Sequence, residues 1–151
     1  MRTSILDLFR IGVGPSSSHT IGPMRATYAF ATALATSGQL VETTRVEVEL
    51  FGSLALTGTG HGTDRAVLLG LSGERPATLD PDRIEPIISS IKTNQHLVLL
   101  GKQSVFFNGA SDLLWRRDLT LPGHPNALAC TAVNVDGQLL NSRSYYSIGG
   151  G

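Results

Sequence analysis

The chain has 151 residues and a formal net charge of zero, from 12 Lys and Arg against 12 Asp and Glu. A neutral chain lacks the long-range field that attracts nucleic acid or an anionic membrane, so neither is expected as a partner. A hydrophobic content of 41% with 16% charged residues excludes a disordered chain and suits one globular domain. The single cysteine, Cys130, excludes an internal disulfide and argues against a closed zinc site.

The two ends of the chain bear on location and completeness. Asp7 interrupts the apolar stretch of the first ten residues, which have no small-residue cleavage site and so do not resemble a signal peptide. No apolar run approaches the ~18 residues of a membrane span. We therefore expect a cytoplasmic protein. Glycines at 149–151 directly follow a strand-like run, which suggests one domain of a longer protein.

The first third of the sequence predicts helices around an irregular segment. Ser4 is a suitable N-cap for a short helix over residues 5–9. Residues 11–23 contain two prolines and three glycines and cannot form regular structure. Pro23 suits a first helical position, and residues 24–36 predict an Ala-rich helix. Because apolar side chains cover most of that helix, we expect it to be largely buried.

The middle of the sequence alternates strands and helices. Residues 44–51 alternate apolar and charged side chains, as a strand with one wet face does. After a loop over 52–62, Thr63 or Asp64 can cap a short helix that runs to Leu71. Isoleucines at 84, 87, 88 and 91 predict an amphipathic helix, which should start near Pro86 because proline disfavours a helix interior.

The remaining segments predict strands, and together the elements define a fold class. Residues 96–100 and 104–107 indicate two short strands, and residues 127–146 predict a hairpin around an Asp136-Gly137 turn. Helices interspersed with half-polar strands favour an α+β fold, with the helices packed on one face of a mainly antiparallel sheet.

Three segments combine glycines with polar side chains that could meet a small ligand. Hydroxyls at 16–20, before a helix, suit a carboxylate or phosphate, although serines there can simply cap the helix. Glycines flank His61 at a helix entrance, but a loop histidine is usually only solvated. Residues 123–126 fit a turn as well as a functional loop. We take His96 and Cys130 to be structural, Cys130 as a small core residue.

Four motifs resemble the iron–sulfur-type L-serine dehydratases of bacteria. The first spans residues 4–24 and includes the run Pro-Ser-Ser-Ser-His-Thr; the second spans residues 52–64 around Gly-His-Gly-Thr-Asp. His-Pro-Asn at 124–126 and Tyr-Ser-Ile-Gly-Gly-Gly at 146–151 are the third and fourth. The motifs follow the family's order from residue 4 to residue 151, so the resemblance covers the chain.

The resemblance implies that residues 1–151 are the N-terminal beta domain of such an enzyme, a domain similar to the allosteric substrate-binding domains of some phosphoglycerate dehydrogenases. A larger C-terminal catalytic domain would hold a four-iron, four-sulfur (4Fe-4S) cluster, since the cluster cysteines are absent here. The enzyme deaminates L-serine to pyruvate and ammonia with the cluster as Lewis acid. The partners implied are this C-terminal domain, the substrate L-serine and a second copy in a homodimer.

The same resemblance assigns roles to residues of this chain. His61 is the expected base that removes the α-proton of serine, and His19 is expected to orient this base or the substrate. The expected substrate-binding residues are Ser16, Ser17, Ser18 and Thr20 for the carboxylate, with Asn126 and Ser147 as weaker candidates. No metal ligand is expected in this chain. Two alternatives remain open, a serine-binding regulatory module without catalytic residues and a dimerisation module.

Overall fold

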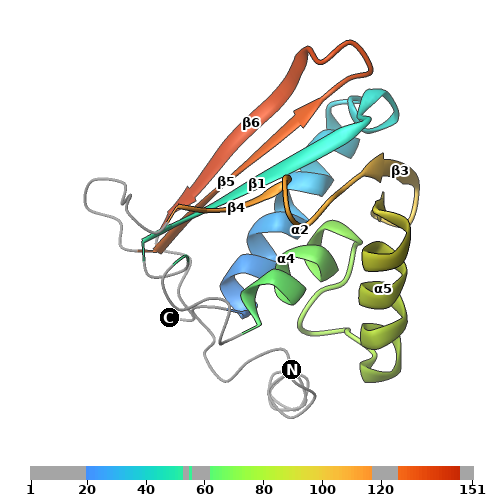
Figure 1. Cartoon of the computed structure of the whole chain (residues 1–151), viewed down its shortest axis with the longest axis vertical. Coiled ribbons are helices and arrows are strands. Elements are labelled where there is room, and N and C mark those ends of the chain that lie inside the picture. The colour runs from blue at the N-terminus through green and yellow to red at the C-terminus, as the bar shows by residue number, and fades with distance from the viewer. Residues whose placement is uncertain (1–19, 53–54, 56–61, 117–125, 147–151) are drawn as a thin grey trace.

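A computed structural model describes residues 20–52, 55, 62–116 and 126–146. The helical elements are α2 (Ile21–Thr36), the short 3-10 helix η1 (Leu40–Glu42), α4 (Thr63–Leu71) and α5 (Pro81–Asn94). The strands are β1 (Arg45–Gly52), β2 (His96–Leu99), β3 (Gln103–Phe106), β4 (Leu113–Arg116), β5 (Asn126–Val133) and β6 (Leu139–Tyr146). Figure 1 shows α2, α4 and α5 on one face of the sheet, which confirms the predicted α+β class.

The sheet is mixed and mostly antiparallel, with β1 in its middle. Along one side of β1, β5 pairs antiparallel over the whole strand, from Arg45 opposite Val133 to Gly52 opposite Asn126. β6 continues the sheet beyond β5, also antiparallel. The other side of β1 has two parallel neighbours in succession, first the end of β3 and then β4. β2 pairs antiparallel with β3 and forms the far edge.

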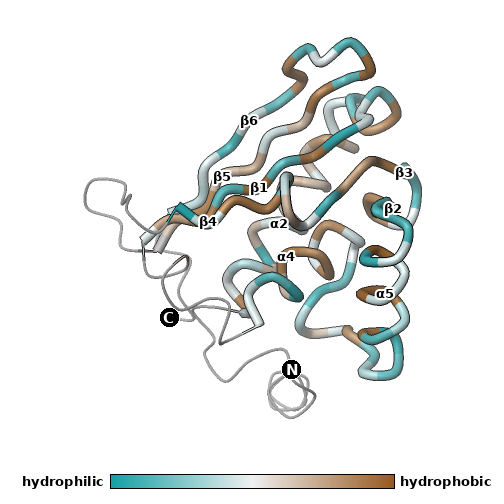
Figure 2. Tube along the Cα trace, in the orientation of Figure 1, coloured by the Kyte–Doolittle hydropathy of each residue, from teal (hydrophilic) through white to brown (hydrophobic). Residues whose placement is uncertain are grey.

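The core forms where the helices meet the sheet. Val46, Val48 and Leu50 of β1 are fully buried, as the alternation of this strand predicts, while Arg45 on the other face is exposed. Figure 2 shows hydrophobic stretches in α4, α5 and β4, the elements that enclose this core. Cys130 of β5 is also fully buried among these residues, which confirms its assignment to the core.

Helices α2 and α4 approach each other closely at one point. An ideal Cβ on Gly70 of α4 would lie 2.0 Å from the Thr27 Oγ1 and 2.4 Å from the backbone oxygen of Met24. The absence of a side chain at Gly70 therefore sets the separation of the two helices. This contact fixes α4 on α2, and α4 begins two residues after His61.

The sequence predicts that α5 starts near Pro86, and this prediction is wrong. The helix begins at Pro81, and Pro86 lies inside it. The Asp80 side chain accepts a hydrogen bond of 3.0 Å from the Asp82 N–H and caps the first turn. Pro86 costs the helix one hydrogen bond near its exposed start, and the buried side chains of Ile84, Ile88 and Ile91 hold the helix against the core.

Three further features depart from the sequence predictions or add to them. Helix α2 begins at Ile21, so Pro23 occupies its third position; the first N–H groups of a helix need no intrahelical partner, which makes proline tolerable there. Strand β4 was not predicted. Helix α2 buries its core side as expected, but Ala29 and Thr36 on another side are exposed.

Among the described helices, none combines the length and apolar character of a membrane span.

Candidate functional site

The structure describes two of the predicted site residues. Thr20 is fully buried and is the N-cap of α2, where its carbonyl oxygen accepts a hydrogen bond of 3.0 Å from the Met24 N–H. Asn126 is the first residue of β5 and lies opposite Gly52 in the register. The other predicted residues lie outside the described residues, and their roles stay predictions: Ser16, Ser17, Ser18, His19, His61 and Ser147.

The four motifs attach to the described structure at one edge. Gly52, the first residue of the second motif, pairs with Asn126 of the third motif. Ala127 pairs with Tyr146, the first residue of the fourth motif. Figure 1 shows that α2 and α4 also begin on this side of the molecule, next to the ends of β1, β4 and β6. We call this edge, formed by these strand ends and helix starts, the motif edge.

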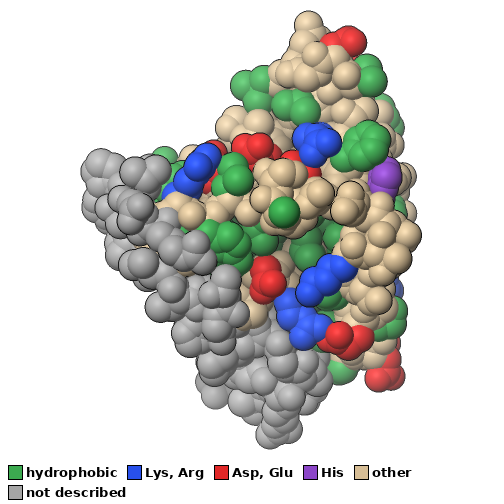
Figure 3. All heavy atoms as spheres, in the orientation of Figure 1, with side chains coloured by type: hydrophobic (Ala, Val, Ile, Leu, Met, Phe, Trp, Pro, Cys, Tyr) green, Lys and Arg blue, Asp and Glu red, His purple; other side chains and the backbone are tan. Residues whose placement is uncertain are grey.

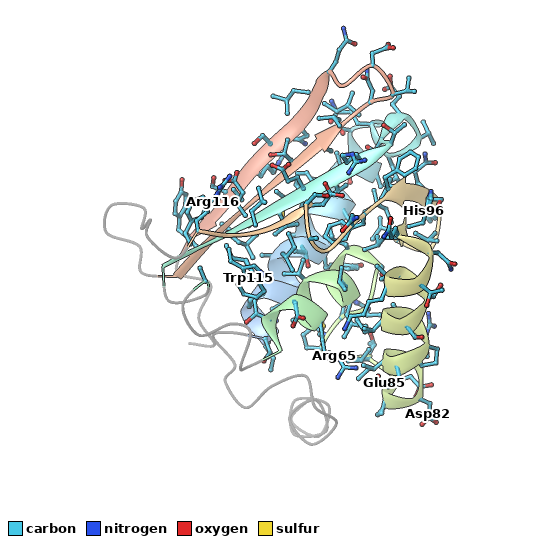
Figure 4. All side chains as sticks on the ribbon, in the orientation of Figure 1. Arg65, Asp82, Glu85, His96, Trp115 and Arg116 are labelled. Atoms are coloured by element: carbon cyan, nitrogen blue, oxygen red, sulfur yellow. The ribbon has the colours of Figure 1, made fainter. Side chains whose placement is uncertain are left out.

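The directions of the strands explain why the described ends of motifs distant in the sequence lie at this edge. β5 runs opposite to β1 and β6, so its start lies beside their ends. β4 runs parallel to β1, so its last residue, Arg116, lies beside Phe51. The short ion pair between Arg116 Nε and Glu49 Oε2, 2.9 Å, joins these two strands near the edge. Figure 4 shows Arg116 and Trp115 on this side, with His96 on the opposite side of the molecule.

A cavity of about 270 Å³ lies beside the start of α4. Residues from α4, the end of α5, the crossing segment 107–112 and β4 line it: Asp64, Leu68, Ile91, Lys92, Gln95, Phe107, Asn108, Gly109, Leu113 and Trp115. Asp64 and Lys92 have opposite charges, and neither is in an ion pair within the described ranges. Figure 3 shows acidic and basic side chains on this face, around exposed hydrophobic ones.

A buried carboxylate holds the segment that forms one wall of the cavity. Both oxygens of Asp112 accept hydrogen bonds from Arg45 Nη1, at 2.8 and 2.6 Å. Asp112 Oδ2 also accepts from the Asn108 N–H at 2.8 Å, and the Asp112 N–H donates to the Asn108 oxygen at 2.7 Å. Asp112 is 2% exposed, so these bonds compensate the loss of water around its charge. They fix residues 108–112 between β3 and β4.

Sequence reasoning did not identify this cavity. In the sequence, Asp64 is a candidate helix cap within the second motif. Nothing in the sequence singles out Lys92 or Asn108. Their proximity depends on the packing of α5 and the crossing segment against α4. Arg65 and Glu85, which Figure 4 shows pointing toward each other, form an ion pair that links α4 to α5.

Two ionisable side chains of the hairpin are unsuited to chemistry. Burial raises the pKa of the Cys130 thiol far above its ordinary value, so the thiol stays protonated and is a poor nucleophile. Burial, and to a lesser extent Cys130, raise the pKa of Tyr145 to about 12, against a lowering effect of Arg143. His96 is exposed on the edge strand β2, where its Nδ1 lies 2.9 Å from the Asn94 backbone oxygen.

The residues of this chain do not fit an iron–sulfur cluster. A 4Fe-4S cluster needs several thiolate ligands, and the sequence has one cysteine, whose side chain is in the core. Within the described ranges, no group of three or more His, Cys, Asp or Glu side chains could hold a metal ion. A cluster of this kind would therefore need ligands from outside these 151 residues.

The described residues form an α+β domain with a mixed sheet, and the described ends of the four sequence motifs lie at its motif edge. The sequence model of the serine dehydratase beta chain family matches residues 4–151. The chain belongs to the serine dehydratase beta chain family.

Curated relatives agree with this membership. The chain is 44% identical over 151 residues to the L-serine dehydratase of Streptomyces coelicolor, a match that covers 100% of this chain and 33% of the relative. It is 43% identical over 149 residues to L-serine dehydratase 1 of Escherichia coli, covering 98% of this chain and 32% of the relative. The chain thus spans about a third of the length of these relatives.

Proposed function

We propose that this chain is the N-terminal beta domain of an L-serine dehydratase, a cytoplasmic enzyme that converts L-serine into pyruvate and ammonia. The observation that carries the proposal is the family match over residues 4–151, together with relatives that carry this name. The described ends of the four motifs lie at the motif edge, which adds support, because residues that form one active-site wall must lie near one another.

In this proposal, the chain contributes a base and a polar wall to a site that another domain completes. A neutral imidazole suits removal of the α-proton near neutral pH, and His61 is our candidate for it. Loss of the proton and of the serine hydroxyl, as water, gives aminoacrylate. Its imine tautomer then takes up water to give pyruvate and ammonia. The cluster that would help the hydroxyl to leave belongs to the C-terminal domain.

The described residues that directly follow His61 form the start of α4. Gly62 directly follows and adopts a left-handed conformation, with φ of 77°, as the N-cap of α4. The Gly62 oxygen accepts a hydrogen bond of 3.1 Å from the Ala66 N–H, and Thr63 is fully buried. In this proposal, the helix start holds the chain directly after the candidate base.

The remaining assignments concern the substrate. Ser16, Ser17, Ser18 and Thr20 are proposed to bind the serine carboxylate at the start of α2, where backbone N–H groups and the helix dipole favour an anion. His19 is proposed to orient His61 or the substrate. Asn126 and Ser147 complete the wall in this proposal, and the position of Asn126 opposite Gly52 places its backbone at the end of β1.

The test is the activity of the holoenzyme, by which we mean these residues together with the domain or subunit that completes the relatives' length. The holoenzyme should form pyruvate and ammonia in equal amounts from L-serine, with D-serine as the control substrate. His61→Ala should lower turnover by at least ~10²-fold, the usual contribution of a positioned base. Its melting temperature should change little, because the sequence predicts a loop at this position and a loop side chain buries little area. Absence of L-serine turnover in the wild-type holoenzyme would refute the proposal.

A second candidate function is a serine-binding regulatory module. The cavity beside α4 favours it, because Asp64 and Lys92 could face the ammonium and carboxylate groups of one amino acid. Calorimetric titration of the 151-residue chain with L-serine and D-serine separates the two candidates. Our proposal expects weak or no binding, because its site is incomplete without the other domain. Tight, stereoselective binding that Asp64→Asn abolishes would instead support regulation. Sedimentation of the same sample tests the homodimer.

A further inference from the structure

Helix α2 is apolar on nearly every side. Arg25 is its only charged residue among Ile21–Thr36. One side buries Met24, Phe30 and Leu34 in the core, whereas Ala29 and other small side chains on another side face outward. A helix that is apolar all round is normally covered all round. The described elements cover α2 on its core side, and the outward side has no matching cover among them.

A groove of about 530 Å³ runs between this outward side and β6. Tyr28, Ala29, Thr32, Ala33 and Thr36 of α2 form one wall, and Arg143 of β6 lies on the other. Small side chains on a helix let the backbone of a second helix approach closely, since the distance between helix axes depends on the side chains at the contact. The Thr32 Oγ1 is buried and has no hydrogen-bond partner within the described part of the chain.

Arginines without a carboxylate partner surround this groove. Of the arginines that the structure describes, Arg45, Arg65, Arg83 and Arg116 form ion pairs with Asp or Glu. The other three are on α2 or beside the groove: Arg25, Arg75 and Arg143. Arg75 lies 5.6 Å above the ring of Tyr28, which lines the groove. No acidic side chain is among the residues that line it. The groove is therefore apolar at its base and positively charged at its rim.

We propose that the groove between α2 and β6 docks a helix whose face is small and apolar and is bordered by Asp or Glu residues. This inference rests on the proposed function, since it assigns the helix to the C-terminal domain of the same enzyme. The relatives are about three times as long as this chain, so they contain enough further sequence to supply the helix. A second copy of α2 is a poor occupant, because it would bring Arg25 toward arginines and offers no carboxylate.

Thiol labelling tests the docking directly. Cys130 is buried, so a cysteine introduced by Ala29→Cys is the reactive thiol of the isolated 151-residue chain. Ser89→Cys, at an exposed position of α5, is the matched control. The labelling rate with a maleimide is measured for each site by peptide mass spectrometry, in the isolated chain and in the holoenzyme. We expect Ala29→Cys to react at least about tenfold more slowly in the holoenzyme, equivalent to about 1.4 kcal/mol of protection. Ser89→Cys should react equally in both.

Charge reversal tests the chemistry of the occupant. Arg25→Glu combined with Arg143→Glu should raise the labelling rate of Ala29→Cys in the holoenzyme toward that of the isolated chain. Lys102→Glu, an exposed charge outside the groove, should leave the rate unchanged. Equal labelling in both forms, or no effect of the arginine reversals, would overturn the proposal.

Two outcomes separate this inference from neighbouring ones. The first outcome is that Ala29→Cys reacts more slowly than Ser89→Cys in the isolated chain and that this chain sediments as a dimer. This outcome would assign the groove to a second copy and overturn the proposed occupant. Turnover of L-serine is read independently in the same holoenzyme. A holoenzyme that lacks L-serine turnover but has a protected groove would refute the proposed function and keep the docking site. A holoenzyme that turns over L-serine but has an unprotected groove would keep the proposed function and refute the docking site.

Discussion

Gly70→Ala is the substitution for which the structure predicts the clearest loss of stability. The added Cβ would meet the Thr27 Oγ1 at 2.0 Å and the backbone oxygen of Met24 at 2.4 Å. Overpacking typically costs 1–3 kcal/mol, and we expect roughly the upper value because a backbone atom blocks the way. Alanine in place of glycine returns about 1 kcal/mol through helix propensity. The expected net loss is about 2 kcal/mol in the free energy of unfolding.

Urea and thermal denaturation followed by circular dichroism measure this loss. For a chain of this size, about 2 kcal/mol corresponds to a decrease in Tm of roughly 4–8 °C. Gly109→Ala is the matched control, since its Cβ would meet nothing within 4 Å, and it should change stability by less than about 0.5 kcal/mol. Thr27→Ala combined with Gly70→Ala should remain destabilised, because the Met24 oxygen still blocks the Cβ. A Gly70→Ala variant as stable as the wild type would refute the described contact between α2 and α4.

Three further predictions concern the buried carboxylate, the cysteine and the absence of cluster ligands. Asp112→Ala should lower the free energy of unfolding by about 1–3 kcal/mol, because it leaves the Asn108 N–H without its acceptor; a change below 0.5 kcal/mol in urea denaturation would contradict this. Burial raises the pKa of Cys130, so its contribution to stability is complete below the ordinary pKa near 9 and is lost as pH rises above it. Wild-type stability should therefore fall more steeply above pH ~9 than that of Cys130→Ala, by up to about 1.4 kcal/mol per pH unit, and equal slopes would count against a buried thiol. Incubation of the 151-residue chain with iron and sulfide should give no stable brown cluster and no serine turnover, and a visible cluster spectrum would overturn the domain assignment.

Local signals in the sequence were sufficient for most elements. Alternation identified β1, and the Asp136-Gly137 turn identified the β5–β6 hairpin. The same kind of signal is present for α5 at residues 80 and 81. Asp80 followed by Pro81 is a good N-cap and first helical residue, and together they outweigh the single hydrogen bond that Pro86 removes.

Non-local packing explains what the sequence could not show. β4 is four residues long and has no alternation to identify it, and it forms a strand because β1 offers a free edge beyond the end of β3. The motif edge depends on the order and direction of strands, which no motif encodes. The cavity likewise depends on the Asp112–Arg45 pair, whose partners are 67 residues apart in the sequence. The motifs predict candidate site residues, and the topology brings the described ends of the motif segments to one edge.

Exchange of the α-proton of L-serine with solvent deuterium tests the central claim most directly. In deuterium oxide, the wild-type holoenzyme should exchange or eliminate this proton, whereas His61→Ala should do neither at a measurable rate. His19→Ala should retain exchange and show a raised KM or a smaller loss of turnover, as expected for a residue that orients its neighbour. Loss of exchange in His19→Ala with retention in His61→Ala would reverse the two roles. Full exchange and turnover in both variants would contradict the claim that this chain supplies the base.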